Sequence, residues 1–340
     1  MKRRNIIIVI VAIAIILLAG YFTTQYFLQP KVTLKVFCAG SLKIPLDQLA
    51  SIYEEKYDVK VEIEASGSVE AARKVIDLGK PCDVLAVADY RLFEQYMYPE
   101  HTEWYAAFAS NEVVLAFTSN SKYADYIIKN PDKWYEVLAK KDVKFGFSDP
   151  NKDPCGYRAV GVIALASIYY NNESILKDLI LSKTNIEASV SASKIDVYVP
   201  ASLEKHARDL EIRSKSVDLI ALLEAGSLDY AFEYKSVAKQ HNLLYIELPE
   251  KINLKNPGYD DFYSKVTVHI LVGSEREASM TMKSIVYGVT IPKCAKYLKE
   301  AIEFVKLLLS EVGRDVFSRN GQDFLEKPIF YGNAPSEIKG

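Results

Sequence analysis

The chain has 340 residues, of which 49% are apolar and 25% are charged, and its net charge is −2. This composition excludes a disordered chain and predicts a globular protein that is long enough for two domains. The balance of 42 basic and 44 acidic residues excludes a bulk positive charge, so we expect no nucleic acid as a partner. The four cysteines show no metal-site or redox spacing, and we expect small buried residues, although long-range disulfides stay possible.

The first 30 residues predict the compartment. Three basic residues at 2–4 precede an unbroken apolar run over 6–20, and the apolar character continues to Leu28. Positive charge before an apolar segment keeps the N-terminus in the cytoplasm and sends the following chain outside. Residues 1–30 are therefore a cleaved signal peptide or a membrane anchor. The remaining chain is extracytoplasmic, anchored or secreted, with a candidate glycosylation site at Asn172.

The next segments alternate between strand and helix patterns. Period-two or buried apolar runs predict strands, and apolar residues three or four apart predict helices. The predicted strands are 31–37, 59–64 and 83–88, and the helices between them are 46–57 and 69–78. This order favours a parallel sheet with right-handed crossovers.

The middle and end of the chain continue the alternation. Residues 113–117 and 285–291 are long β-rich runs, and we interpret them as strands that cross between two lobes. A helical segment over 123–138 is interrupted at Pro131. The segment 185–199 is an irregular loop or a hairpin. Further predicted elements are a strand at 143–147, a helix at 159–170, a helix at 217–225, strands at 228–232, 244–248 and 266–272, helices at 236–240 and 295–309, and a surface tail from Gly321.

These elements predict an α/β protein with two lobes and a ligand cleft between them. We expect lobe 1 to contain residues 31–115 and 283–340, and lobe 2 to contain 116–282. In open α/β sheets, ligands bind at the carboxyl ends of the strands. The strand-to-helix junctions of both lobes are therefore the expected site.

Four such junctions carry residues that suit a small anion. The central one is the loop 147–158, in which prolines and a glycine precede an apolar helix. The others lie at Ser41, Ser68 and Tyr234. Free N–H groups at a helix N-terminus attract an oxyanion, glycine allows close approach, and hydroxyl groups donate hydrogen bonds.

Each of these residues also has a simpler interpretation. A serine at such a junction often only caps the helix, and so does an aspartate such as Asp153. Tyr234 suits a core aromatic residue, and Cys155 suits either a nucleophile or a residue that offers only its backbone N–H. The residues alone leave these alternatives open.

Several motifs resemble the archaeal molybdate/tungstate-binding proteins of ABC transporters, over nearly all of 31–329. They are FCAGSL (37–42), ASGS (65–68), DPCGYR (153–158), YKSVA (234–238) and VYGVTIP (286–292). The resemblance implies a type II periplasmic-binding-protein fold, preceded here by the hydrophobic leader. It also implies delivery of a tetrahedral oxyanion to a membrane permease with a cytoplasmic ATPase.

The resemblance further implies a set of oxyanion-binding residues: Gly40, Ser41, Ser68, Asp153, Pro154, Cys155, Ser216 and Tyr234. In the family, two carboxylates bond the metal itself, and Asp153 corresponds to the first. The second is a glutamate, but this chain has Ser216 at that position. Glu233 is a substitute candidate, although it neighbours Tyr234 on a strand and should point to the opposite face.

We therefore expect a monomeric binding protein, not an enzyme, with molybdate or tungstate as its ligand and no cofactor. One alternative is a binding protein for another oxyanion or for ferric ion. A less favoured alternative is an enzyme on the same fold that uses Cys155 or a serine as nucleophile. The chain shows no Ser/His/Asp or Cys/His arrangement and no phosphate-binding glycine loop.

Overall fold

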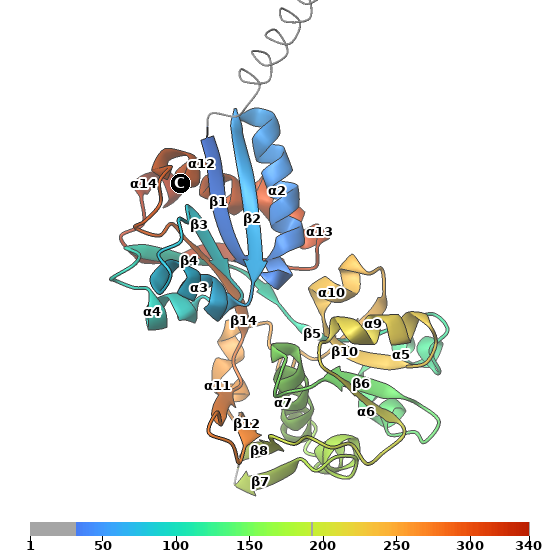
Figure 1. The fold of residues 1–340 in the computed structure, drawn as a ribbon. Coiled ribbons are helices and arrows are strands. Elements are labelled where there is room, and N and C mark those ends of the chain that lie inside the picture. The colour runs from blue at the N-terminus through green and yellow to red at the C-terminus, as the bar shows by residue number, and fades with distance from the viewer. Residues whose placement is uncertain (1–31, 192, 340) are drawn as a thin grey trace, which may run out of the picture.

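The computed structural model describes residues 32–191 and 193–339, and these form two lobes (Figure 1). Lobe 1 is built on a six-stranded sheet in the order β15-β4-β14-β3-β1-β2. Its strands are β1 (Val32–Ala39), β2 (Val59–Ser66), β3 (Val84–Val87), β4 (Trp104–Asn111), β14 (Ile285–Thr290) and β15 (Asp323–Gly332). Its helices are η1 (Gly40–Leu42), α2 (Lys43–Lys56), α3 (Ser68–Ile76), α4 (Arg91–Tyr96), α12 (Leu298–Leu309), α13 (Glu311–Arg319) and α14 (Ser336–Lys339).

Lobe 2 contains two sheets, in the orders β11-β5-β10-β6-β9 and β13-β12-β8-β7. Its strands are β5 (Val113–Phe117), β6 (Phe145–Ser148), β7 (Glu187–Ser191), β8 (Lys194–Pro200), β9 (Leu210–Arg213), β10 (Tyr230–Tyr234), β11 (Leu244–Glu247), β12 (Val266–Val272) and β13 (Ala278–Thr281). Its helices are α5 (Ala124–Lys129), η2 (Pro131–Lys133), α6 (Trp134–Leu138), α7 (Pro154–Tyr169), α8 (Ser174–Leu176), η3 (Lys177–Leu181), α9 (Val217–Glu224), α10 (Lys235–Gln240), η4 (Pro257–Tyr259) and α11 (Asp260–Tyr263).

The predicted alternation at the start of the chain is confirmed. β1 pairs in parallel with both β2 and β3, as the strand-helix-strand order predicts. The sheet as a whole is mixed, because β14 pairs antiparallel with β3 and β4, and β15 pairs antiparallel with β4. The carboxyl ends of β1 and β2 point toward lobe 2 (Figure 1).

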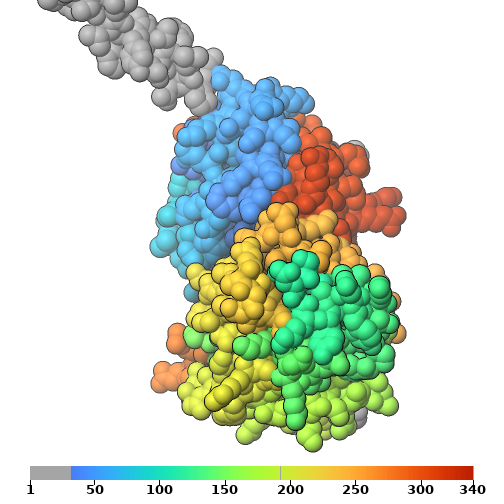
Figure 2. Space-filling view, turned by 90° about the vertical axis from the view of Figure 1, so that its right-hand side faces the viewer, coloured from blue at the N-terminus to red at the C-terminus, as the bar shows by residue number. Residues whose placement is uncertain are grey.

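The two β-rich runs at 113–117 and 285–291, interpreted as strands that cross between the lobes, each belong to a single sheet. The strand β5 lies inside the lobe 2 sheet, between β11 and β10, and β14 lies inside the lobe 1 sheet, between β4 and β3. Both strands are fully buried, which explains their continuous apolar patterns. The chain passes between the lobes at Glu112 and again at residues 282–284. Figure 2 shows the two ends of the described chain, blue and red, on one side of this passage and its green middle part on the other.

The segment from Gly321 lies mostly at the surface, as predicted, since no residue of β15 is fully buried, but its strand was not predicted. Gln322 is fully buried, and the following residues form β15, which pairs with β4 at the edge of the lobe 1 sheet. The pattern in β15 is irregular, since exposed charged residues and Pro328 interrupt it. Such interruptions are typical of an edge strand, and they hide its strand character in the sequence.

The segment 185–199 forms a hairpin of β7 and β8, one of its two expected forms. The helix interruption near Pro131 is also confirmed, as η2 lies between α5 and α6. No helix of the described residues is long and apolar enough to cross a bilayer. The expected leader at 1–30 lies outside those residues.

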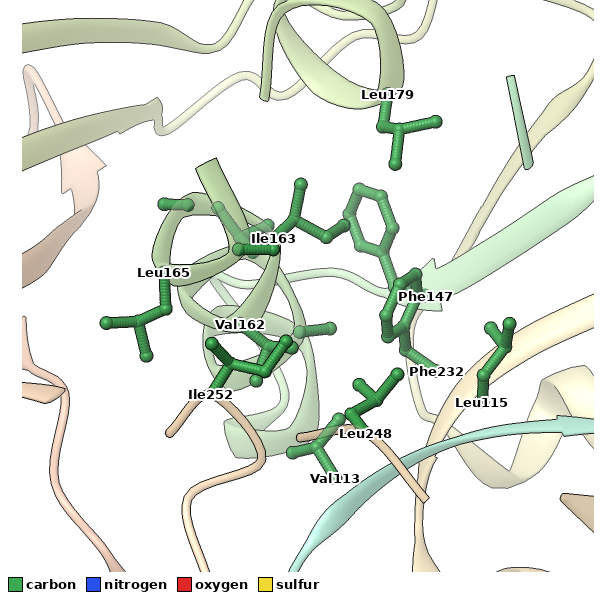
Figure 3. Packing of buried hydrophobic residues seen from close by; sticks show 14 of the residues in the cluster. Val113, Leu115, Phe147, Val162, Ile163, Leu165, Leu179, Phe232, Leu248 and Ile252 are labelled. Atoms are coloured by element: carbon green, nitrogen blue, oxygen red, sulfur yellow. The ribbon is translucent and has the colours of Figure 1, made fainter. Parts of the chain in front are cut away.

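Helix α7 forms the centre of lobe 2. Its side chains are apolar on nearly every face because it is buried among the strands around it. Figure 3 shows Val162 and Ile163 of α7 near Phe147 of β6 and Phe232 of β10. This packing holds the N-terminus of α7 at the carboxyl ends of β6 and β10.

Candidate anion site

The lobe 1 part of the site lies where β1, β2 and β3 end. Ala39 at the end of β1 pairs with Ser66 at the end of β2, so η1 and α3 begin side by side. The Ser68 hydroxyl accepts a hydrogen bond from the backbone N–H of Ala88, just after β3, at 3.0 Å. Three strand ends therefore meet at one edge, and Gly40 is exposed there.

Ser41 and Ser68 do not act as helix caps, which was the simpler interpretation of both residues. The first turns of η1 and α3 have no side-chain cap. The Ser68 oxygen accepts from Ala88, and its O–H has no acceptor within residues 32–191 and 193–339, so it can donate to a ligand. Ser41 is half-buried in η1.

Asp153 is the first lobe 2 residue of the site, and it does cap α7. Its Oδ1 accepts a hydrogen bond from the Cys155 N–H at 3.0 Å, and its Oδ2 accepts from the Ser216 N–H at 2.7 Å. The side chain thus joins the N-termini of α7 and α9. Each carboxylate oxygen has a further lone pair, so both bonds are compatible with another partner.

The loop in front of α7 is tied to its surroundings. The Asp149 N–H donates to the Arg213 carbonyl at 2.7 Å, and the Asn151 Oδ1 accepts from the Leu271 N–H at 2.7 Å. In the first turn of α7, a Cβ at Gly156 would lie 2.1 Å from the Ser148 carbonyl oxygen. Only glycine allows this close approach, which fixes the start of α7 against the end of β6.

Ser216 lies at the start of α9, near three site residues. Its N–H donates to Asp153. Its side chain acts on the Glu233 carboxyl group and on the Cys155 thiol, where it opposes the rise in each pKa. Glu233 is fully buried, and its Oε1 has no hydrogen-bond partner among the described residues. A carboxyl group therefore does lie beside the serine that stands at the family's glutamate position.

Burial controls the ionisation of this cluster. Burial above all, with a smaller contribution from the nearby Asp153 charge, raises the pKa of Glu233 to about 8. Burial likewise raises the pKa of the Cys155 thiol well above its ordinary value. The thiol is therefore neutral at physiological pH and a weak nucleophile.

Tyr234 lies at the end of β10 on the face toward α7, where it packs against the lobe 2 core. Ala231, which faces the same way as Glu233, packs with α9. Glu233 and Tyr234 thus point to opposite faces of β10, as predicted, and Glu233 lies near the start of α9.

Arg158 is a site residue that the sequence analysis did not single out. Its Nη1 donates to the Tyr234 hydroxyl at 2.5 Å. Burial raises the pKa of Tyr234 well above its ordinary value, although the guanidinium opposes this rise. The sequence did contain a signal for this residue, because Arg158 is a single charged residue in the first turns of an otherwise apolar helix.

A cavity between the lobes adjoins these residues. It has a volume of about 350 Å³ and is lined by Asp89 and Arg91 from lobe 1, and by Tyr157, Arg158 and Lys283 from the other side. Burial lowers the pKa of Arg158, but Tyr157, Tyr234 and, to a smaller extent, the Asp89 carboxylate raise it, and the net shift is upward. Arg158 of lobe 2 thus lines the same cavity as Asp89 and Arg91 of lobe 1.

The expected site residues fall into two groups. Cys155, Ser216, Glu233 and Tyr234 surround Asp153 or its contacts in lobe 2. Gly40, Ser41 and Ser68 lie together at the strand ends of lobe 1. Pro154 is the exposed first residue of α7. The cysteine expectation holds for Cys38, Cys82 and Cys155, which are buried and free, whereas Cys294 is free but exposed.

The chain is similar over most of its length to archaeal solute-binding proteins. It is 51% identical to the Molybdate/tungstate-binding protein WtpA of Pyrococcus abyssi, over 92% of this chain and 90% of that one. It is 52% identical to an uncharacterized solute-binding protein of Staphylothermus marinus, over 99% of this chain and 96% of that one. The resemblance inferred from the motifs is confirmed.

Solved structures share the fold at low identity. The periplasmic molybdate-binding protein of Azotobacter vinelandii matches with a TM-score of 0.52 and 16% identity, over 86% of this chain and all (100%) of that one. The sulfate-binding protein of Mycobacterium tuberculosis matches with a TM-score of 0.51 and 11% identity, over 87% and 88%. A family model described as "Bacterial extracellular solute-binding protein" matches residues 34–322. The chain therefore belongs to the bacterial extracellular solute-binding protein family.

Proposed function

We propose that the protein captures molybdate or tungstate outside the cytoplasmic membrane and delivers it to the permease of an ABC transporter. The observation that carries this proposal is the 51% identity with the Pyrococcus abyssi protein, which is named for these two anions. A second relative with the same name, from Thermococcus kodakarensis, is 48% identical over 92% of this chain. The two groups of site residues support it chemically.

In this proposal, the anion lies between the lobes in a type II periplasmic-binding-protein arrangement. Its oxygens accept hydrogen bonds from backbone N–H groups and hydroxyls of both lobes. The proposed donors are Gly40, Ser41 and Ser68 in lobe 1, and the Ser216 and Tyr234 hydroxyls in lobe 2. The Pro154–Cys155 turn lines the proposed site and orients Asp153, to which the Cys155 N–H donates. Hinge closure around the ligand then expels water and strengthens these bonds.

Asp153 is the proposed direct ligand to the metal. A carboxylate 4 Å from one unit of negative charge costs about 4 kcal/mol at moderate screening, so a site for oxygen contacts alone should exclude it. A bond to hexavalent tungsten or molybdenum, which prefers oxygen ligands, removes this conflict. The hydrogen bonds from Cys155 and Ser216 hold the carboxylate in one orientation for that bond.

The second carboxyl group of the proposed site is Glu233. Ser216 is too short to reach the metal as a glutamate would, but Glu233 lies beside it with an unpartnered Oε1. With a pKa of about 8, the group is protonated at neutral pH. A neutral acid can donate a hydrogen bond to an oxo group without repelling the dianion.

Arg158 supports the Tyr234 contact in this proposal. A guanidinium only donates hydrogen bonds, so it occupies a lone pair of the Tyr234 oxygen and leaves the O–H proton for an acceptor elsewhere. The positive charge behind the phenol makes that O–H a stronger donor.

The competing candidate is another oxyanion, above all sulfate, because a sulfate-binding protein shares the fold at a TM-score of 0.51. Sulfate has shorter bonds and cannot accept a carboxylate ligand at sulfur, so it should leave buried donors unpaired. An enzyme based on Cys155 is disfavoured by its neutral, buried thiol. We further propose a monomer whose residues from 31 onward are extracytoplasmic, with the transporter's ATPase on the cytoplasmic side.

A calorimetric competition tests the function. The purified protein is titrated with tungstate, molybdate and sulfate, and then with sulfate in the presence of a saturating amount of tungstate. We expect tight binding of the first two anions and at least about a thousandfold weaker binding of sulfate, because buried unpaired donors carry a large penalty. Equal or tighter binding of sulfate would overturn the proposal.

A further inference from the structure

Three segments that are far apart in sequence meet between the lobes, and each contributes two consecutive residues. These hinge pairs are Asn111–Glu112 at the end of β4, Lys235–Ser236 at the start of α10, and Gln322–Asp323 at the start of β15. The first residue pair connects the two lobes, the second belongs to lobe 2, and the third belongs to lobe 1. Five of the six residues are buried, and Asp323 is half-buried.

One member of each hinge pair joins an uncharged hydrogen-bond chain. The Asn111 Nδ2 donates to the Ser236 hydroxyl at 2.8 Å and to the Tyr287 hydroxyl at 2.8 Å. The Gln322 Nε2 donates to the same Tyr287 hydroxyl at 3.3 Å and to the Ser41 carbonyl at 2.7 Å. These hydrogen bonds therefore connect η1, which contains Ser41, without a break to Ser236 in α10, two residues after Tyr234.

The other member of each pair joins a charged cluster. The Lys235 Nζ lies 2.9 Å from the Glu112 carboxylate and 3.2 Å from the Asp323 carboxylate. A second lysine, Lys255, lies 2.6 Å from Asp323 and 3.3 Å from Glu112. Opposite charges from both lobes thus meet around the buried pair Glu112 and Lys235, which solvent screens less than the partly exposed Asp323 and Lys255.

The backbones of the two lobes also touch at this point. Gly321 has a φ of +79°, and a Cβ on it would lie 2.8 Å from the Ser236 Cα and 2.9 Å from the Lys235 carbonyl oxygen. Glycine is needed both for the left-handed conformation and for the close approach. The contact places Gln322 where its amide reaches the lobe 1 loop.

We propose that Asn111, Tyr287 and Gln322 are positioning residues. They hold two segments of the candidate anion site, η1 (Gly40–Leu42) and the start of α10 after Tyr234, in a fixed relation across the hinge. The Gln322 amide binds the Ser41 carbonyl, so this acceptor is occupied and cannot turn toward an anion. Because the peptide unit is planar, the same bond fixes the direction of the Leu42 N–H. At the other end, the Ser236 bond fixes the start of α10 and with it Tyr234.

This inference rests on the proposed function only for the identity of the ligand. The coupling between η1 and α10 needs no ligand, because every hydrogen bond that connects them joins two described residues. Tyr287 is the most informative residue to change. Among the described residues, its hydroxyl bonds only Asn111 and Gln322 and contacts neither η1 nor α10 directly.

The test compares Tyr287→Phe and Gln322→Met with a matched control, Tyr53→Phe. Tyr53 is an equally buried lobe 1 tyrosine whose hydroxyl donates to the Glu300 carbonyl at 3.1 Å, away from the hinge pairs. Hydrogen–deuterium exchange of the ligand-free full chain is followed by mass spectrometry. We expect exchange about three- to tenfold faster in both Gly40–Leu42 and Lys235–Gln240 in the two hinge variants, and no change there in the control.

Exchange that rises in only one loop of Tyr287→Phe, or in neither, would overturn the coupling. Tungstate titration of the same variants supplies the second readout, and we expect about a tenfold loss of affinity in the hinge variants and none in Tyr53→Phe. If the unmodified protein binds no tungstate while both loops respond in exchange, the proposed function fails and the hinge coupling stands. If it binds tungstate and Tyr287→Phe binds it equally well, the positioning role is wrong.

Discussion

The Asp153 carboxylate accepts a hydrogen bond from the Ser216 N–H, with 2.7 Å between Oδ2 and N. This bond joins the N-termini of α7 and α9 and lies at the position where the family resemblance places a second carboxylate. Glu233 lies beside it and brings a buried carboxyl group to the same place from the neighbouring strand. In the proposed site, Glu233 is therefore the second acid, and it comes from another element than the family's glutamate.

Asp153→Asn tests the direct bond to the metal. The amide keeps the shape of the side chain and an acceptor for the Cys155 N–H, but its NH2 group would face the Ser216 N–H. We therefore expect a loss of unfolding free energy of about 1–3 kcal/mol. Tungstate affinity should fall at least about tenfold, because a neutral amide is a poorer ligand for a hexavalent metal. X-ray absorption of bound tungsten should show more than four oxygen ligands in the unmodified protein and fewer in the variant. Four ligands in both would exclude the bond.

The double variant Ser41→Ala and Ser68→Ala tests the lobe 1 donors. A hydrogen bond to a charged group contributes about 1.5–3 kcal/mol, so loss of both hydroxyls should weaken tungstate binding at least about a hundredfold by calorimetry. Ser51→Ala is the control, because its hydroxyl bonds only the Asp47 carbonyl on the exposed face of α2. Unchanged affinity in the double variant would remove both serines from the site.

Glu233→Gln tests the ionisation of the buried acid through stability. The pKa of Glu233 is about 8 in the folded protein, against an ordinary value of 4.5 for the unfolded chain. Between these values the folded state holds a proton that the unfolded state releases, so the unfolding free energy falls as pH rises. The slope from this group is at most about 1.4 kcal/mol per pH unit and ends near pH 8.

Urea unfolding at pH 5, 7 and 9 measures this contribution. We expect the difference in unfolding free energy between Glu233→Gln and the unmodified protein to shift in favour of the variant as pH rises. Parallel pH profiles for the two proteins would show that Glu233 ionises normally.

Gly156→Ala tests the close packing at the start of α7. The new Cβ would lie 2.1 Å from the Ser148 carbonyl oxygen, a backbone atom that cannot move without shifting the loop. We expect a loss of at least about 1–3 kcal/mol in unfolding free energy. Gly67→Ala is the control, because its Cβ would meet nothing within 4 Å and its φ is −64°. Similar thermal unfolding of both variants would contradict the proposed packing constraint.

Local patterns were enough to predict most elements and the junctions between them. Alternation and helical spacing placed β1, β2 and the helices that follow them, since these patterns follow from burial of one face. They failed at β15, because charged residues and a proline interrupt an edge strand. They also left the role of Asp153 open, since an aspartate before a helix can cap it, bind a ligand, or do both.

The amino-acid sequence by itself determined the compartment prediction, the α/β class, the strand-to-helix junctions that form the candidate anion site and, through its motifs, the family. Only the tertiary structure decided that Glu233 meets Ser216, that Arg158 holds Tyr234, and that Gln322 reaches the Ser41 loop. The physical reason is that each of these contacts joins segments far apart in the chain. Periodicity and capping report a residue's near neighbours, whereas the partner of a buried polar group depends on how whole elements pack.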